Sequence, residues 1–229
     1  MVSLLLASLL FVGIHAVISG TGLRAVIVGK IGQGPYMALF SLLSAGALFW
    51  CILAYAAAPH VELWADVTAL KMLAIPLMLV AIVLAALASS TPNPTATGGE
   101  KALRDEQSAR GIIKVTWHPF LVGVTIWSIA HILANGDLAS VIMFGGFLAL
   151  SLIGPLQIDA KRAAKYPDTW PHFIQQTSWL PFAAIIQGRN KVTLNEIGWG
   201  RIGGGVALFL VILLLGHEWA IGVSVLPLG

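Results

Sequence analysis

Two histidines lie inside apolar stretches long enough to be buried in a lipid bilayer. His15 belongs to the run Val2–Ser19, and His131 belongs to the run Pro119–Ala134. An imidazole in such a place is costly, because hydrocarbon offers no hydrogen-bond partner, so it needs a partner within the protein. Imidazoles are also common axial ligands of haem iron, and neighbouring helices can hold a macrocycle between them. Both residues are therefore candidate metal ligands.

The helical period places small residues beside one histidine and aromatic residues beside the other. Residues seven apart lie about 20° out of register on a helix, so the stripe of His15 carries mainly serine and glycine. By the same arithmetic Phe120 and Trp127 lie on the face of His131, with Trp117 near it. These walls would suit a flat macrocycle. The alternative is that both histidines only hold helices together through hydrogen bonds.

The other histidines lie near the expected ends of the apolar spans. His118 precedes Pro119 at a helix start, where proline is tolerated because its missing N–H costs nothing. His118 could be a second ligand, could face an anion at the helix N-terminus, or could merely lie at the interface. His60 and His217 fall at the outer side, where an interfacial role is the simpler interpretation.

The composition predicts an all-α, multi-pass transmembrane helical bundle, taken as a single domain over residues 1–229. The chain is 58% hydrophobic and only 10% charged, whereas a soluble domain carries about 25% charged residues. Its single cysteine, Cys51, excludes an intramolecular disulfide and any multi-cysteine metal site. No basic face or motif indicates nucleic-acid binding. The expected surroundings are membrane lipid.

Six apolar spans approach the roughly 20 residues that a bilayer requires. They are Val2–Ser19, Tyr36–Ala58, Ala69–Ser89, Pro119–Ala134, Leu138–Ile158 and Ile202–Trp219. The fourth span is short, and the residues before His118 could extend it at its inner end. The segment Asp159–Trp179 is amphipathic, and we expect it to lie along the inner membrane interface.

Lysine and arginine positions predict the orientation in the membrane. With the N-terminus outside, every basic residue except Lys71 falls in one of three inner loops. Because positive residues are retained on the cytoplasmic side, both termini are predicted to be periplasmic in a bacterial inner membrane.

The stretch Gly198–Gly203 (GWGRIG) matches the pattern G-x-G-x-x-G of dinucleotide-binding turns. No strand precedes it and it opens a membrane helix, so the cofactor interpretation is rejected. We expect Gly198, Gly200 and Gly203–Gly205 to allow close helix packing instead.

Four stretches together resemble the NnrU family of bacterial membrane proteins. They are FVGIHAVISG around His15, GIIKVTWHP at Gly111–Pro119, WSIAHILANGD at Trp127–Asp137, and TSWLPFAAIIQGR at Thr177–Arg189. The resemblance covers nearly the whole chain. That family is associated with denitrification, and it is similar to plant 15-cis-zeta-carotene isomerase.

The resemblance implies a cofactor and two kinds of activity. The isomerase is understood to hold haem b between two membrane histidines, which correspond here to His15 and His131. One implied activity is a haem-dependent cis–trans isomerisation of an apolar polyene, and the other is support of nitric oxide or nitrite reduction beside a nitrogen-oxide reductase. The family usually has arginine where Trp117 stands, which removes a partner for a haem propionate. His60 corresponds only loosely to a further histidine of the isomerase.

Two alternatives from other classes stay open. One is a non-enzymatic membrane scaffold or small-molecule carrier, in which the histidines only join helices. The other is a relative of membrane methyltransferases, because His118–Gly123 matches their H-P-x-x-x-G motif. That resemblance implies S-adenosylmethionine binding at the inner face, although those enzymes also keep arginine where Trp117 stands.

Overall fold

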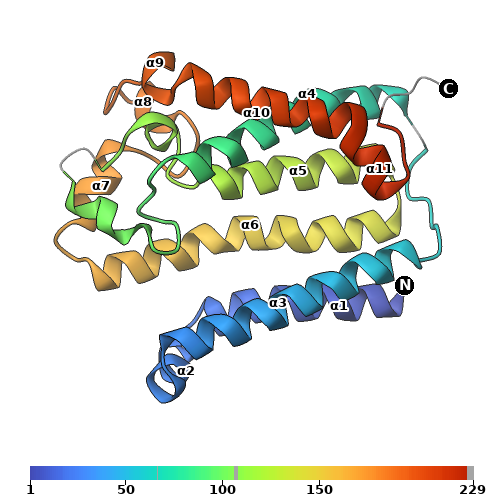
Figure 1. Ribbon diagram of the computed structural model, residues 1–229, viewed down its shortest axis with the longest axis horizontal. Helices are drawn as coiled ribbons and strands as arrows, with labels where there is room; N and C mark the ends of the chain where they lie inside the picture. Colours follow the sequence, from blue (N-terminus) through green and yellow to red (C-terminus); the bar gives the residue numbers. More distant parts are fainter. Residues whose placement is uncertain (66, 106–107, 226–229) are drawn as a thin grey trace.

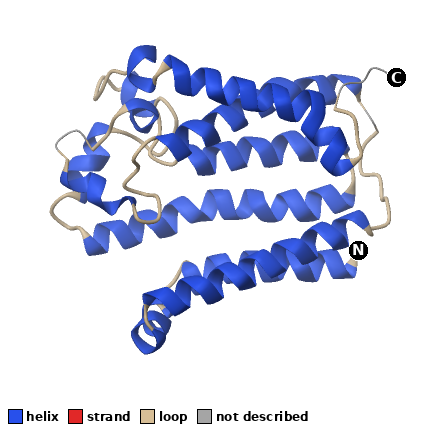
Figure 2. Ribbon diagram, in the orientation of Figure 1, coloured by secondary structure: helices blue, strands red, loops and turns tan. Residues whose placement is uncertain are grey.

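The computed structural model describes residues 1–65, 67–105 and 108–225 (Figure 1). Within them the regular elements are helices, as Figure 2 shows. Five helical units are long and apolar enough to cross a membrane: α1 with π-helical η1 (Val2–Gly13 and Ile14–Ser19), α3 (Gln33–Ala56), α4 (Thr68–Ser90), α6 (Leu138–Lys165), and α10 with η4 and α11 (Trp199–Val211, Ile212–Gly216 and His217–Ile221). A sixth apolar helix, α5 (Pro119–Asn135), is shorter. The predicted all-α membrane bundle is confirmed.

The six helical units lie side by side in the order α3, α1, α6, α5, α4, α10 (Figure 1). Each helix satisfies its own backbone hydrogen bonds, so its outer side can remain apolar towards lipid. Many large apolar side chains, such as Leu42, Leu156 and Trp219, are accordingly exposed on the isolated chain. The order places α6 between the helix that carries His15 and the helix that carries His131.

Polar side chains fasten α1 and η1 to α6. Gln157 donates a hydrogen bond to the carbonyl of Ala16 at 3.0 Å, and Lys161 donates one to the carbonyl of Ser19 at 2.8 Å. Near the other end Ser8 donates to the carbonyl of Ile142 at 3.2 Å. Such interhelical hydrogen bonds hold helices together where the hydrophobic effect does not.

The short elements gather at one end of the bundle, opposite the N-terminus (Figure 1). They are α2 (Leu23–Ile31), η2 (Gly99–Arg104), η3 (Gly111–Lys114), α7 (Trp170–Gln176), α8 (Ala183–Ile186) and α9 (Leu194–Ile197). We call this the inner end, because the predicted inner loops lie there. Its assignment to the cytoplasm stays a prediction.

The expected extension of the fourth span before His118 is wrong. The helix α5 begins at Pro119, and His118 has φ −119° and ψ 52°, outside the helical region. The ring of a proline disfavours the helical conformation in the residue before it, so the helix cannot continue backwards through His118. Residues 111–114 form the separate turn η3 instead.

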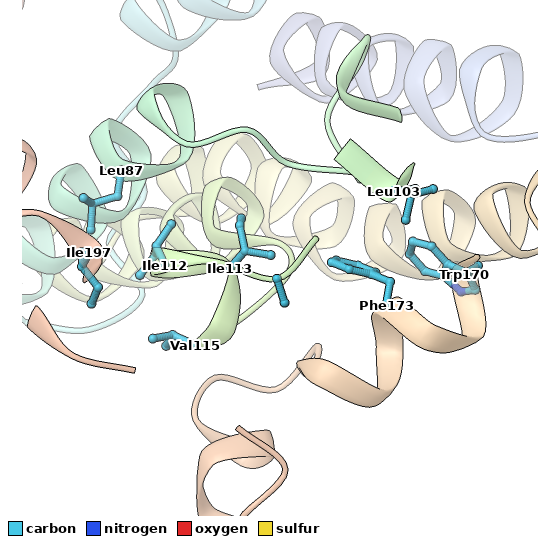
Figure 3. Packing of buried hydrophobic residues seen from close by; sticks show 9 residues of the cluster. Leu87, Leu103, Ile112, Ile113, Val115, Trp170, Phe173 and Ile197 are labelled. Atoms are coloured by element: carbon cyan, nitrogen blue, oxygen red, sulfur yellow. The ribbon is translucent and has the colours of Figure 1, made fainter. Parts of the chain in front are cut away.

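The segment Asp159–Trp179 does not form one surface helix. The helix α6 continues to Lys165, and α7 then packs Trp170 (4% exposed) and Phe173 (0% exposed) into a hydrophobic cluster (Figure 3). The cluster also contains buried side chains from the end of α4, from η2 and η3, and from α9: Leu87, Leu103, Ala109, Ile112, Ile113, Val115 and Ile197. Loops distant in sequence therefore cover these two aromatic residues, while the interfacial position of the segment stays a prediction.

An ion pair joins the first part of this inner end to α6. Arg162 donates to Glu100 at 2.6 Å and to the carbonyl of Ala96 at 2.9 Å. Burial alone would raise the pKa of the Glu100 carboxyl, but the hydrogen bond and the charge of Arg162 outweigh it and lower that pKa.

Only one glycine of the GWGRIG region and its continuation packs tightly against another helix. A Cβ at Gly205 would lie 3.0 Å from the Cα of Val83 on α4, whereas one at Gly200, Gly203 or Gly204 would meet nothing within 4 Å. Gly198 has φ +99° at the start of α10, a conformation that glycine adopts readily. Close helix packing is thus confirmed at Gly205, and its expectation at Gly200, Gly203 and Gly204 is wrong, because these glycines face no neighbouring helix of the described chain.

Alanine at Gly123 is expected to destabilise the contact between α5 and α4. Its Cβ would lie 2.9 Å from the carbonyl oxygen of Ala81, while one at Gly145 on α6 would meet nothing within 4 Å. Gly123→Ala should be less stable than Gly145→Ala by about 1–3 kcal/mol, the usual cost of overpacking. Denaturation of the purified variants in detergent measures this difference. Equal stability would contradict the close approach.

Candidate functional site

A cavity of about 490 Å³ opens between α4, α5 and the C-terminal helical unit, at the end of the bundle opposite the inner end. We call it the outer cavity. Its wall is largely apolar and includes Ala74, Ile75, Met78, Ile82, Phe209 and Leu213. Three histidines also line it, His60, His131 and His217. Its volume falls in the range of about 300–1,000 Å³ that is typical of small-molecule sites.

The imidazole of His131 is held in one orientation. Its Nδ1 lies 2.8 Å from the carbonyl oxygen of Trp127, and because a carbonyl only accepts, Nδ1 must carry the proton. The ring stacks on Phe144 at 4.6 Å between centroids and lies 5.0 Å from the ring of Trp127. No described residue hydrogen-bonds to Nε2. That nitrogen is available to bind a metal ion or to accept a proton.

His15 repeats this local geometry elsewhere in the bundle. Its Nδ1 donates to the carbonyl of Phe11 at 2.8 Å, and its ring lies 4.4 Å from Phe11 and 5.2 Å from Phe40. It belongs to the π-helical turn η1, and such turns frequently occur at functional sites. His15 does not line the outer cavity.

Aromatic rings occupy the route between the two histidines. From His131 the ring contacts run through Trp127 to Phe147 (5.3 Å) and on to Phe11 (5.2 Å), which touches His15. The structure therefore does not bring the two imidazoles face to face.

The other residues predicted to surround the cofactor lie in different parts of the structure. Trp127 packs on His131 as the helical period indicated. Phe120 is 53% exposed and lies about 16 Å from His131 along α5 at 1.5 Å per residue, so it does not line the outer cavity. Trp117 and His118 lie before α5, at the inner end.

A polar network fixes the turn between α5 and α6 beside the outer cavity. Asp137 caps α6 by accepting hydrogen bonds from the backbone N–H and the hydroxyl of Ser140, at 2.9 and 2.7 Å. Asn135 donates to Ser140 at 2.9 Å and to the hydroxyl of Tyr55 at 3.3 Å. The turn Asn135–Asp137 is thus a tight connection between α5 and α6. Tyr55 and Ser140 were not identified from the sequence, since they join the network only in space.

His118 belongs to a second cluster, at the inner end. It is 3% exposed, and its Nε2 lies 2.9 Å from the carboxylate of Asp159 on α6. The indole N–H of Trp117 donates to the same carboxylate at 3.1 Å. Trp117 therefore contributes a hydrogen-bond donor at the position where the resemblance implied an arginine. Sequence reasoning missed Asp159, although a carboxylate directly after an apolar span is itself a signal.

Comparison with known proteins gives a family and two partial relatives. A model of the family described as "NnrU protein" matches residues 3–225. The 15-cis-zeta-carotene isomerase of Zea mays is 37% identical over 82 residues, and that of Arabidopsis thaliana is 35% identical over 79 residues. These matches cover 36% and 34% of this chain but only 22% of each relative. No solved structure matches significantly.

Removal of the Asp159 carboxylate is expected to destabilise the inner end. In Asp159→Ala the N–H groups of Trp117 and His118 lose their acceptor, and an unsatisfied buried donor costs about 1–3 kcal/mol. Thermal denaturation in detergent measures the loss, with Asp168→Ala as the control because Asp168 is exposed. If Asp159→Ala is as stable as Asp168→Ala, the hydrogen bonds to Asp159 do not stabilise the inner end.

Proposed function

The chain belongs to the NnrU protein family, and we propose that it is a membrane protein that holds an apolar, conjugated ligand beside His131 and takes part in a carotenoid-isomerase-like reaction. The outer cavity carries this proposal, because it combines an apolar wall with an imidazole whose Nε2 is available. A polyene is itself a long apolar molecule that dissolves in hydrocarbon. The chain spans only about a fifth of the isomerases it matches, so their substrate is part of the proposal.

Haem b is the cofactor that we propose for this site, and the Nε2 of His131 would bind its iron. An axial imidazole usually donates its other N–H to a carbonyl, which fixes the tautomer and the ring orientation. His131 meets this requirement through Trp127. When bound, the haem would supply a Lewis-acid or one-electron centre, as cofactors do in such chemistry.

Two residues are candidates for the second ligand. His15 is the partner that the family resemblance implies, and its ring lies against Phe11, outside the outer cavity. His217 lines the outer cavity already, and its Nδ1 donates to the carbonyl of Val223 at 2.8 Å, which leaves Nε2 with a lone pair. The variants below separate these candidates.

The chain itself would position the ligand and surround it with apolar side chains. The apolar side chains of α4 and of the C-terminal helical unit would contact the ligand, and the network of Asn135 and Asp137 holds the α5–α6 turn beside the opening. A role beside nitrogen-oxide reductases, a scaffold or carrier role, and S-adenosylmethionine binding near His118 all stay predictions.

Haem binding is expected to depend on His131. Protein expressed with sufficient haem should show a Soret absorption band, and His131→Ala should lose it, because the ligating nitrogen is removed. Loss in His15→Ala or in His217→Ala identifies the second ligand. The exposed His172→Ala is the matched control and should keep the band. No band in the unmodified protein, or an unchanged band in His131→Ala, would contradict the proposal.

Isomerase activity is expected to require space in the outer cavity. Vesicles that contain the protein and 15-cis-zeta-carotene should lose the 15-cis isomer faster than empty vesicles, as followed by chromatography. Ala74→Phe should slow this loss about tenfold or more, because the new ring occupies the cavity. Ala38→Phe makes the same change on the exposed side of α3 and should be neutral. Equal rates in both variants would place the reaction elsewhere or exclude it.

A further inference from the structure

A second and larger cavity, of about 730 Å³, lies at the inner end. We call it the inner cavity. It is formed by the chain after α4, by η3, by the loop between α8 and α9, and by the start of α10. Its lining comprises Thr91, Pro92, Ala109, Arg110, Gly111, Lys114, Gln176, Arg189, Asn190, Glu196 and Arg201. It shares no lining residue with the outer cavity.

The charge of the inner cavity is strongly positive. Four cationic side chains line it, Arg110, Lys114, Arg189 and Arg201, against the single carboxylate of Glu196. That carboxylate is already occupied, because it pairs with Lys114 at 2.8 Å and accepts the backbone N–H of Gly111 at 3.1 Å. Among the residues that the structure describes, the remaining positive charge therefore has no counterion in the lining.

The arginines differ in how far the protein uses them. Arg189 is largely structural, since its Nη1 donates to three backbone carbonyls, those of Ile174, Gln175 and Thr177. Arg110 makes only a long contact of 3.4 Å with the exposed Asp105. The guanidinium of Arg201 hydrogen-bonds to no described residue; only its backbone N–H donates, to Gly198. At least one guanidinium is thus available to a ligand.

Two buried polar atoms of the lining lack partners. The hydroxyl Oγ1 of Thr91, a residue only 6% exposed, and the amide Oδ1 of Asn190 form no hydrogen bond within the described chain. A buried polar group without a partner costs about 1–3 kcal/mol, so folded proteins rarely leave one. A hydroxyl can donate to an anion, and an amide oxygen can accept from a protonated oxygen or from a bound water.

We propose that the inner cavity binds a phosphate-bearing anion. Guanidinium groups match phosphate oxygens in geometry and charge, so Arg201 is the main recognition residue. Thr91 contributes a hydroxyl donor. Large apolar side chains are exposed on α9 and α10 next to the cavity, notably Leu194 and Trp199. The phosphate can therefore belong to a lipid headgroup or to a soluble compound, and the experiment separates these sources.

The test uses the full-length protein and two probes. In neutral detergent, sodium pyrophosphate is titrated by calorimetry against a chloride background of equal ionic strength. In nanodiscs, native mass spectrometry measures how much phosphatidylglycerol the protein retains relative to phosphatidylcholine. Arg201→Gln should weaken binding of the effective probe about tenfold, as expected for a lost hydrogen bond to a charged group. Lys101→Gln, an exposed basic residue of the same end outside the cavity, is the matched control.

Thr91→Val separates binding from stability. It removes the unpartnered hydroxyl while keeping the shape of the side chain, so it should weaken binding about threefold without lowering the thermal midpoint. In contrast, Thr116→Val should lower the midpoint, because the Thr116 hydroxyl donates to the carbonyl of Trp179 at 2.8 Å.

Each outcome decides the proposal. Pyrophosphate binding that is lost in Arg201→Gln supports a soluble phosphate ligand. Retention of phosphatidylglycerol alone, lost in the same variant, supports a lipid headgroup. No saturable binding of either probe, or equal losses in Arg201→Gln and Lys101→Gln, overturns the proposal and reduces the cavity to a basic surface.

Discussion

The absence of hydrogen-bond partners in hydrocarbon is the constraint on which this bundle depends. Each membrane histidine satisfies one ring nitrogen within its own helix, where Nδ1 donates to the carbonyl four residues earlier. This single bond fixes the tautomer and leaves Nε2 with its lone pair. This bond lowers the free-energy cost of burying the imidazole in hydrocarbon, and it leaves Nε2 able to bind a metal ion.

The helix α6 connects the two ends of the molecule. At the outer end its cap and its first turn join Tyr55 and Asn135 in the network beside the outer cavity. At the inner end it provides Asp159 to His118 and Trp117. Polar networks thus lie at both ends of α6, and between them Phe147 contacts Trp127 while Ser151 accepts a hydrogen bond from Thr125. One outcome is an apolar cavity that contains an imidazole, separated from a basic cavity that faces the opposite end.

Local patterns predicted the features that depend on neighbouring residues. Span length and composition identified the six apolar helical units, and the helical period placed Trp127 on the face of His131. The same period did not predict the position of Phe120 correctly. Phe120 and His131 share a face of α5, but about three helical turns separate them, so Phe120 lies far from the cavity. It also could not recognise that Trp170 and Phe173 are buried, since distant loops cover them.

The sequence by itself determined that the chain is a membrane bundle of the NnrU family, because hydropathy and motifs are properties of adjacent residues. Only the tertiary structure decided that α6 lies between the helices of the two histidines, and that His217 rather than His15 shares the outer cavity with His131. Helix order within lipid is set by close packing and by a few interhelical hydrogen bonds, such as that from Gln157 to Ala16. Those contacts join residues far apart in the chain, so no periodicity along the sequence records them.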